Sequence, residues 1–407
     1  MTDAAVVGRI LREYHQRTIR PSDIRHVHGS VRGTRVAYRL MQPDGESVVV
    51  RALRADAPVG ADFIGCGAAT MLDLVTSRAA TLAWLAERGY PAPRVVLTRT
   101  GELVGLAGAW LTLATTFVAG TALRPDRGQL GLLGEALGWL HSLPAVVAPG
   151  VASGAVERER DPGQSAAKSA WHLEAAVPAT LRRLDSVEAL LPPSWRPLHG
   201  AFRQTIEAVH QHARDLPQAV VHGDARPGNA ILTGAAPAAA RAGPAAVGAG
   251  AAAGADPAPV GAGPVGVTLI GWETSGLGLP VLDLGHCLLE CHLDQDLPPD
   301  QLEAWHIQPD DERIAAVAEG YATQRVLGPA ELDLLPDGVR FGTAFVGAIY
   351  FEEALVRGIG GASMDIRLER LRNRLAVSPA IAERASHHLG RAEKRYAKPG
   401  RPGAAGA

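Results

Sequence analysis

Hydrophobic and polar residues follow two different periods along the first 120 residues. Short apolar runs that alternate with polar positions predict strands, and an apolar spacing of three to four residues predicts helices. A Pro-Asp-Gly turn at 43–45 separates the first two runs, and Gly89 ends the main helical stretch. The elements predicted in this part are a helix at 5–18, two strands within 32–53, a helix at 67–88, and strands within 94–106 and 109–120. These elements predict a small sheet with one main helix.

From Gly128 onward the apolar spacing becomes helical. Two stretches interrupt it: an apolar run at 218–233 and a short predicted strand at 267–270. The helices predicted here are 128–143, two within 166–215, and then 281–293, 310–325, 330–358 and 365–390. We therefore expect an α+β fold with two lobes, a small β-rich one followed by a larger helical one.

The composition suggests where these lobes begin and end. We expect an N-terminal lobe over 1–118 and a helical C-terminal lobe over 119–390. Residues 234–266 are almost only Ala, Gly, Pro and Val, which predicts a flexible insert. The basic, Pro- and Gly-rich stretch 391–407 predicts a disordered tail.

The overall composition excludes several classes of protein. The chain has 407 residues, of which 47% are hydrophobic and 20% are charged, and its formal net charge is −2. These values are typical of a folded globular protein and do not favour a nucleic-acid binder. The first residues hold no apolar segment typical of a signal peptide, and no uninterrupted apolar run could span a membrane. We expect a soluble, cytoplasmic protein that has no contact with membranes.

The apolar run at 218–233 contains the motif with the clearest chemistry. Its centre reads His222-Gly-Asp224-Ala-Arg-Pro-Gly-Asn229, so an Asp is followed five residues later by an Asn. This spacing is typical of a kinase catalytic loop, where the Asp receives the proton of an attacking hydroxyl and the Asn holds a metal ion. The alternative is an Asp-Asn turn that caps a helix.

Several further segments resemble one protein family in the same order. VVHGDARPGNAIL resembles the catalytic loop of the aminoglycoside phosphotransferase and choline kinase-like superfamily, and LIGWETSGLGLPVLDLGHCL resembles its metal-binding strand and following helix. WLAERGYPAPRVV, LTLATTFVAGTAL, LGEALGWLHSLP and the C-terminal helices resemble other parts of that family. The resemblance runs from about residue 20 to residue 390 and implies a bilobal, protein-kinase-like fold.

The resemblance also implies a role for individual residues. Asp224 would be the catalytic base, His222 would brace the loop, Asn229 would bind metal, and the buried Asp283 would hydrogen-bond the loop. The backbone around three hinge residues would meet the adenine ring: Thr116, Phe117 and Val118. The implied cofactors are ATP or GTP with Mg²⁺, and the implied acceptor is a hydroxyl of a small molecule or peptide. Asp283 also fits an ordinary Asp at a helix N-terminus.

The chain departs from the family at the metal-binding strand. The family has an Asp that binds magnesium where this chain has Gly271, and glycine offers no ligand atom. Glu273 lies two residues on, on the same side of a strand, and is the candidate substitute ligand. Family members also often carry an acid at the Glu273 position, so this residue fits a structural role as well.

A second departure lies in the N-terminal lobe. No lysine precedes Lys168, and the strand position that carries Lys in the family is Arg51. Arg51 would contact phosphate, because a guanidinium binds phosphate with two hydrogen bonds; a solvent-facing strand residue is the alternative. The helix position of the family's pairing Glu falls near Arg78, so we expect no Lys–Glu pair and a repulsive Arg51–Arg78 arrangement instead.

Two other groups of residues suggest further sites. His286, Cys287, Cys291 and His292 are potential zinc ligands, but only the two cysteines share a helix face, so buried apolar cysteines are the favoured interpretation. Acidic residues gather between 294 and 312, which suits either a solvated loop or the site of a cationic acceptor such as an aminoglycoside.

Two functional hypotheses follow from these motifs. The first is an ATP- or GTP-dependent O-phosphotransferase that acts on a small molecule, with Asp224 and Asn229 intact. The second is a catalytically impaired pseudokinase that binds a ligand or serves as a scaffold for a protein partner, for instance in a biosynthetic complex. The loss of the acid at Gly271 motivates this second hypothesis.

Overall fold

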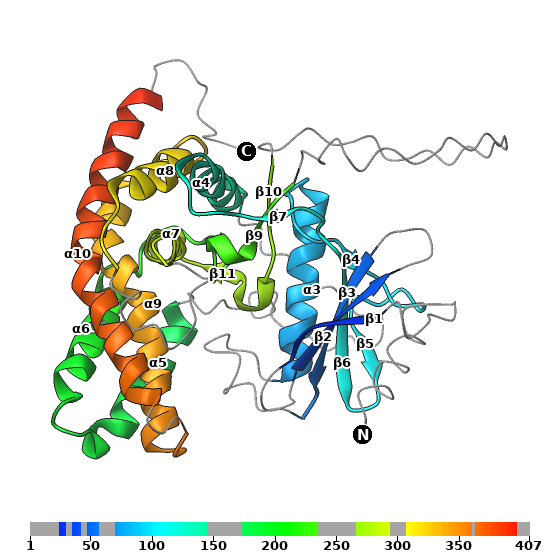
Figure 1. Cartoon of the computed structure of the whole chain (residues 1–407), viewed down its shortest axis with the longest axis horizontal. Helices are drawn as coiled ribbons and strands as arrows, with labels where there is room; N and C mark the ends of the chain where they lie inside the picture. Colours follow the sequence, from blue (N-terminus) through cyan, green and yellow to red (C-terminus); the bar gives the residue numbers. More distant parts are fainter. Residues whose placement is uncertain are drawn as a thin grey trace.

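The computed structural model shows two lobes, a sheet with one helix and a bundle of helices, with short strands between them (Figure 1). The structure describes residues 24–29, 35–41, 47–56, 70–144, 173–233, 266–293, 307–359 and 363–396. The expected α+β, bilobal fold is confirmed. The predicted helix at 5–18 and nearly all of the predicted insert lie outside the described residues.

An antiparallel sheet forms the N-terminal lobe. Its main path runs in the order β1-β2-β3-β6-β4, and β5 also pairs with β6. The strands are β1 (Ile24–Gly29), β2 (Arg35–Met41), β3 (Ser47–Arg54), β4 (Val95–Val96), β5 (Gly105–Ala107) and β6 (Trp110–Thr116). The two strands predicted within 32–53 are therefore found and pair as expected. The stretch 94–106 forms only two short strands, because Thr98 to Glu102 make a hydrogen-bonded turn between them.

Strand β3 separates two small apolar clusters. Its alternating side chains place Val48, Val50 and Ala52 in one cluster and Leu53 in the other. Helix α3 (Met71–Glu87) covers the second cluster, and a capping box of Thr70 and Asp73 starts that helix. The C-terminal half of α3 belongs to the large core of the helical lobe. Helix α3 therefore couples the two lobes.

Within the described residues, seven helices build the C-terminal lobe around one large apolar core. They are α4 (Arg127–Ser142), α5 (Leu173–Val187), α6 (Arg196–His212), α7 (Pro280–Glu290), α8 (Asp311–Ala322), α9 (Pro329–Leu355) and α10 (Ser363–Tyr396), and the 3₁₀ helix η3 (Glu188–Leu190) follows α5. Each helix predicted from the apolar spacing of this lobe is found. No helix in the described ranges is long and apolar enough to cross a membrane.

Helix α10 is longer than expected. It continues to Tyr396, so the first residues of the predicted disordered tail are helical. Leu389 and Ala392 are buried and hold this part of the helix against the lobe. Lys394 and Arg395 lie in the last turn, where positive charge is favourable. Residues 397–407 lie outside the described residues.

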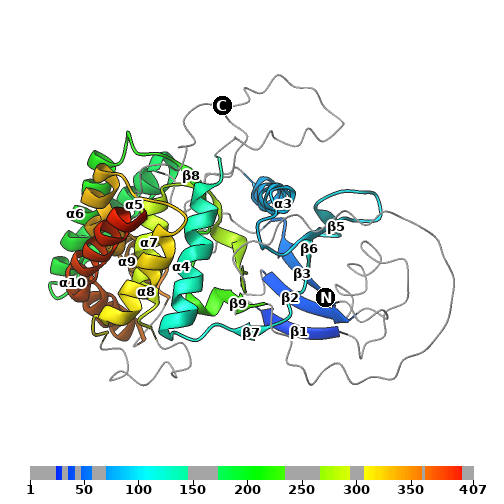
Figure 2. The ribbon, with the colours of Figure 1, turned by 90° about the horizontal axis from the view of Figure 1, so that it is seen from above.

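Short strands between the lobes carry the catalytic motif (Figures 1 and 2). Strands β7, β9 and β10 form one antiparallel sheet, and β8 pairs with β11. The bounds of these elements are β7 (Thr121–Ala122), β8 (Ala219–Val221), β9 (Ala230–Leu232), β10 (Val267–Leu269), β11 (Gly276–Gly278), and the 3₁₀ turns η4 (Pro227–Asn229) and η6 (Trp272–Thr274). The loop from β8 to η4 and the turn from β10 to η6 thus lie next to each other.

Helices α4 and α8 pack through glycines, with no room for larger side chains. A Cβ atom added at Gly320 would overlap the carbonyl oxygen of Gly131, and one added at Gly134 would overlap that of Val317. A Cβ atom at Gly131 would make only an ordinary contact, 3.8 Å from the oxygen of Ala316. The close approach of the two backbones therefore depends on Gly134 and Gly320.

We predict that Gly320→Ala lowers the free energy of unfolding by about 1–3 kcal/mol, the usual cost of overpacking a core. Gly131→Ala, on the facing helix, is the matched control. We expect it to leave stability unchanged or raise it by up to about 1 kcal/mol, because Ala favours helix over Gly. Urea unfolding of the three proteins tests this, and equal stability of Gly320→Ala and the parent would contradict it.

Candidate active site

A buried carboxylate anchors the predicted catalytic loop. Asp283, in the first turn of α7, is fully buried. Its Oδ2 accepts a hydrogen bond from the backbone N–H of His222 at 2.7 Å, and its Oδ1 accepts one from the N–H of Gly223 at 3.0 Å. The Nε2 atom of His141, on α4, lies 3.1 Å from Oδ2. The predicted position of Asp283 beside the loop is the one the structure has.

The anchor continues as a chain of buried polar groups across the helical lobe. His141 Nδ1 lies 3.0 Å from the hydroxyl of Tyr321, and Arg325 donates to the same hydroxyl at 3.0 Å. Arg325 also pairs with Glu331 at 2.7 Å. The chain therefore links the catalytic loop to α4, α8 and the start of α9.

Burial fixes the protonation of the two histidines nearest to this anchor. It lowers the pKa of His141 and that of His222 below the ordinary value, despite nearby carboxylates. The neutral His141 ring donates from Nε2 to Asp283, so its Nδ1 accepts from Tyr321. Burial would raise the pKa of Asp283, but the bond from His141 and the bonds to the loop keep it below the ordinary value.

His222 braces the loop through both of its ring nitrogens. Nδ1 accepts from the N–H of Asp224 at 3.2 Å, and Nε2 donates to the carbonyl of Ile270 at 2.9 Å. The next residue, Gly223, has φ +81°, and a Cβ atom there would lie 2.5 Å from the carbonyl oxygen of Thr274. The loop therefore needs glycine at this position.

Asp224 lies at the centre of four interactions. Its Oδ1 faces Nε2 of His286 at 3.3 Å and Nε of Arg226 at 3.1 Å. The amide of Asn229 donates to its Oδ2 at 2.7 Å and to its backbone carbonyl at 2.9 Å. The side chain of Asp224 remains 34% exposed, which leaves it open to a ligand.

The cations around Asp224 keep it ionised. Burial would raise the pKa of Asp224, but the hydrogen bond and charge of His286 and the charge of Arg226 lower it to about 2. Burial would lower the pKa of His286, but its bond to Asp224 and the charge of Glu290 raise it above the ordinary value. Both shifts thus favour an ionised Asp224 beside a protonated His286.

Gly271 lies directly against Asn229. It has φ +80°, and a Cβ atom at this position would lie 3.0 Å from Oδ1 of Asn229. The N–H of Ile270 donates to the carbonyl of Asn229, so the loop and the turn are also joined by backbone. The predicted metal-ligand position is thus beside Asn229, as the sequence implies, but it offers no side chain.

Arg51 and Glu273 contact each other. Nε of Arg51, on β3, lies 2.7 Å from Oε1 of Glu273, on η6, and the side chains are 27% and 33% exposed. The pair joins the N-terminal lobe to the turn after Gly271. The partner of Arg51 is thus an acid from the other lobe. The sequence had instead suggested a repulsive arrangement of Arg51 with Arg78.

The three hinge residues expected to meet adenine differ in whether their backbone N–H groups are already hydrogen-bonded. The N–H of Thr116 donates to the carbonyl of Arg94, and that of Phe117 donates to Ser47, both at 2.8 Å. The guanidinium of Arg39 stacks on the Phe117 ring at 3.6 Å. Of the three hinge residues, Val118 is thus the one whose N–H has no bond among the described residues.

The remaining candidates from the sequence are the cysteines at the end of α7 and the acidic stretch. Cys287 and Cys291 are buried, which agrees with apolar cysteines. No group of three potential metal ligands occurs among the described residues. In the acidic stretch, Asp310 caps α8 and Asp311 lies 3.1 Å from His388. Residues 294–306 lie outside the described residues.

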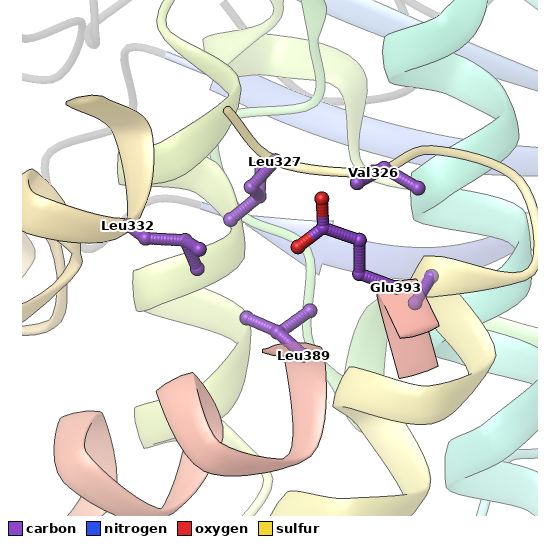
Figure 3. A pocket seen from close by; sticks show the side chains of 6 residues that line it. Val326, Leu327, Leu332, Leu389 and Glu393 are labelled. Carbon is purple, nitrogen blue, oxygen red and sulfur yellow. The ribbon is translucent and has the colours of Figure 1, made fainter. Parts of the chain in front are cut away.

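A shallow apolar hollow lies away from the catalytic loop, between the end of α8, the start of α9 and α10 (Figure 3). The carboxylate of Glu393 points into it. Its lining consists of Ala322, Val326, Leu327, Leu332, Leu389 and Glu393. This lining contains none of the residues predicted for catalysis, so the hollow is not the candidate active site.

The sequence had not singled out two residues that contact Asp224. The sequence suggests His286 only as a potential zinc ligand. It lies three residues after Asp283, however, and so shares a helix face with it. Arg226 lies inside the motif itself, two residues after Asp224. The pattern could have shown that both are close to the loop, but not that both face one carboxylate oxygen.

Comparisons with known proteins agree with the resemblance seen in the sequence. Residues 72–239 match the profile of the phosphotransferase enzyme family. This segment includes the catalytic loop but ends before Gly271. Comparison with curated proteins gives no match. The family match and the structural neighbours confirm the resemblance to the aminoglycoside phosphotransferase and choline kinase-like superfamily.

Solved structures with this fold include three kinases. An amicoumacin kinase, solved with AMP-PNP and Ca²⁺, has a TM-score of 0.58 at 14% identity, over 93% of this chain and 94% of that one. A microcompartment-associated aminopropanol kinase has 0.54 at 15%, over 95% and 100%. A choline kinase from Cryptosporidium parvum has 0.54 at 11%, over 96% and 99%. At these identities the likeness shows the fold.

The buried histidines predict how stability depends on pH. Below about pH 6.5 an unfolded chain protonates both rings, while the folded chain, with lowered pKa values, does not. The contribution of these two rings to the free energy of unfolding should therefore fall as the pH is lowered from 7 to 5, by up to about 1.4 kcal/mol per pH unit for each ring. The raised pKa of His286 acts in the opposite direction. Protonation of His141 would also end its bond from Tyr321.

His141→Gln should reduce this slope by the share of one ring, whatever its effect on stability at pH 7. Urea unfolding at several pH values measures the slope, and His212→Gln, at an exposed histidine of α6, is the control. A slope in His141→Gln equal to that of the parent protein would show that His141 is not buried in its neutral form.

Proposed function

We propose that this chain, whose residues 72–239 match the phosphotransferase enzyme family, transfers a phosphoryl group from ATP or GTP to a hydroxyl of a small molecule. The observation that carries the proposal is the contact of Asp224 with Asn229 in a loop held by Asp283. The structural neighbours named above are kinases of small molecules, which supports the choice of acceptor class.

Asp224 would act on the acceptor hydroxyl. The hydroxyl donates a hydrogen bond to the exposed carboxylate, and its oxygen attacks the γ-phosphorus of the nucleotide. The bond from that phosphorus to the bridging oxygen breaks, and the nucleoside diphosphate leaves with the electron pair. The proton passes to Asp224. Because the pKa of Asp224 is about 2, the transfer occurs late, as the new bond makes the hydroxyl acidic. Orientation of the hydroxyl is therefore the larger part of its role.

The other parts of the site would bind the nucleotide. Val118 supplies the hinge donor for the base, and Arg51 lies on β3, in the lobe that covers the phosphates in this fold. Arg51 is oriented by Glu273, which here replaces the pairing acid of the N-terminal helix. Hinge and arginine together would place the γ-phosphate near the catalytic loop.

The residues present do not fit the magnesium site expected of the family. Gly271 has no ligand atom, Glu273 is paired with Arg51, and both oxygens of Asp224 already face donors. Asn229 is left as a single amide ligand, whereas Mg²⁺ is usually held by one or two carboxylates together with phosphates. No step above is therefore assigned to a metal ion.

The absence of that acid supports a second candidate function. Phosphoryl transfer depends on neutralising the charge of the phosphates, so the loss of a metal-ligand carboxylate costs about 10³-fold or more in rate. A pseudokinase that binds a nucleotide or another ligand without turnover would keep the anchored loop. Its cellular role should survive replacement of both Asp224 and Asn229 by Ala, and loss of that role in the folded double variant would count against it.

We predict that Asp224→Asn lowers kcat for phosphate transfer by about 10²–10⁴-fold, the usual contribution of a positioned base. The measurement is transfer from ATP or GTP to a panel of small hydroxyl compounds. Asp215→Asn, at an exposed position before β8, is the matched control and should leave the rate unchanged. Turnover that is unaffected in Asp224→Asn would refute the proposed role of this residue.

A further inference from the structure

The side-chain carboxylates of Asp224 and Glu273 are both paired with cationic groups. Arg51 pairs with Glu273, while Arg226 and His286 both face the carboxylate of Asp224. Both of these carboxylates are thus already paired with cationic groups. A divalent-cation site instead needs carboxylates that can bind the ion. The pairing seen here leaves N–H donors of the two arginines and suits an anion.

These groups are connected by a series of contacts around Gly271. Asp224 contacts Arg226 on one side and Asn229 on the other. Asn229 lies against Gly271, and two residues later Glu273 contacts Arg51. The two arginines therefore flank the position at which the family's magnesium ligand is missing.

Both guanidinium groups keep donors for a ligand. Each known contact uses the Nε atom, and an arginine has five N–H donors. Within the described part of the chain, the interactions found for Arg51 and Arg226 are these two ion pairs, and the buried Nε of Arg226 has no hydrogen-bond partner. The two arginine side chains are 27% and 35% exposed, so a ligand can reach them. Guanidinium groups bind phosphate with two parallel hydrogen bonds.

We propose that Arg51 and Arg226 bind the nucleotide phosphates directly, and that this chain therefore binds ATP without a divalent cation. The proposal rests on the proposed function for the nucleotide itself. It assigns the charge neutralisation that a metal supplies elsewhere to two side chains of this protein. It also gives Gly271 a reason: an added carboxylate beside Asn229 would repel the phosphates that the arginines attract.

The test is calorimetric titration of the full chain with ATP, in buffer with magnesium and in buffer with EDTA. We expect equal affinity in both. Arg226→Gln and Arg51→Gln should each weaken binding in EDTA by about tenfold or more, the effect of losing a hydrogen bond to a charged group. Arg54→Gln, also on β3 but paired with the exposed Asp56, is the matched control and should bind as the parent does.

Gly271→Asp provides a second, independent variant. Asp tolerates a positive φ better than most residues, and it returns the carboxylate that the family has. We expect this variant to bind ATP more tightly in magnesium than in EDTA, unlike the parent. Equal affinity in both buffers, on folded variant protein, would contradict the link between Gly271 and the metal.

The outcomes separate this proposal from the proposed function. Binding of ATP by the parent only in magnesium would overturn the arginine proposal and leave the phosphotransferase intact. Binding in EDTA without phosphate transfer to any acceptor would support the proposal and favour the pseudokinase. Undiminished binding in both arginine variants, or no binding by folded protein in either buffer, would overturn the proposal, and the latter would also remove the nucleotide from the proposed function.

Discussion

The candidate catalytic loop depends on the hydrogen bonds of one buried carboxylate, that of Asp283. A charge without solvent is costly unless donors surround it, and here two loop N–H groups and His141 supply them. The same bonds hold His222 and Gly223 in one conformation, which in turn determines where Asp224 points. Because Asp283 belongs to α7 and His141 to α4, any shift of these helices would disturb the loop.

This anchor explains why a polar chain crosses an apolar lobe. Tyr321, Arg325 and Glu331 continue the hydrogen bonds from His141 to the start of α9, so each buried polar group in the chain has a partner. Such a chain contributes little net stability compared with apolar packing. Its value here is geometric, since it allows one register of α4, α7, α8 and α9 around the loop.

The sequence predicted those features that depend on near neighbours. Helices such as α4 and α8 follow from their apolar spacing, and the order of residues from His222 to Asn229 predicts the loop. Contacts between distant segments do not follow from spacing. The pairing of Arg51 with Glu273 joins residues more than 200 positions apart on different lobes, and the sequence alone placed Arg51 opposite another arginine. The approach of His286 to Asp224 depends likewise on how α7 packs beside β8.

The Arg51–Glu273 pair also affects which kind of ligand can bind between β3 and η6. A partly exposed ion pair contributes only about 0–1 kcal/mol, so it orients the two lobes without locking them. A phosphate can share Arg51 with Glu273 at small cost, because the guanidinium has further donors. A metal ion at the same place would instead have to compete with Arg51 for Glu273 and would gain nothing from Gly271. The pairing of Glu273 with Arg51 and the missing side chain at Gly271 therefore support the proposed binding of an anion, and not of a cation, beside Asn229.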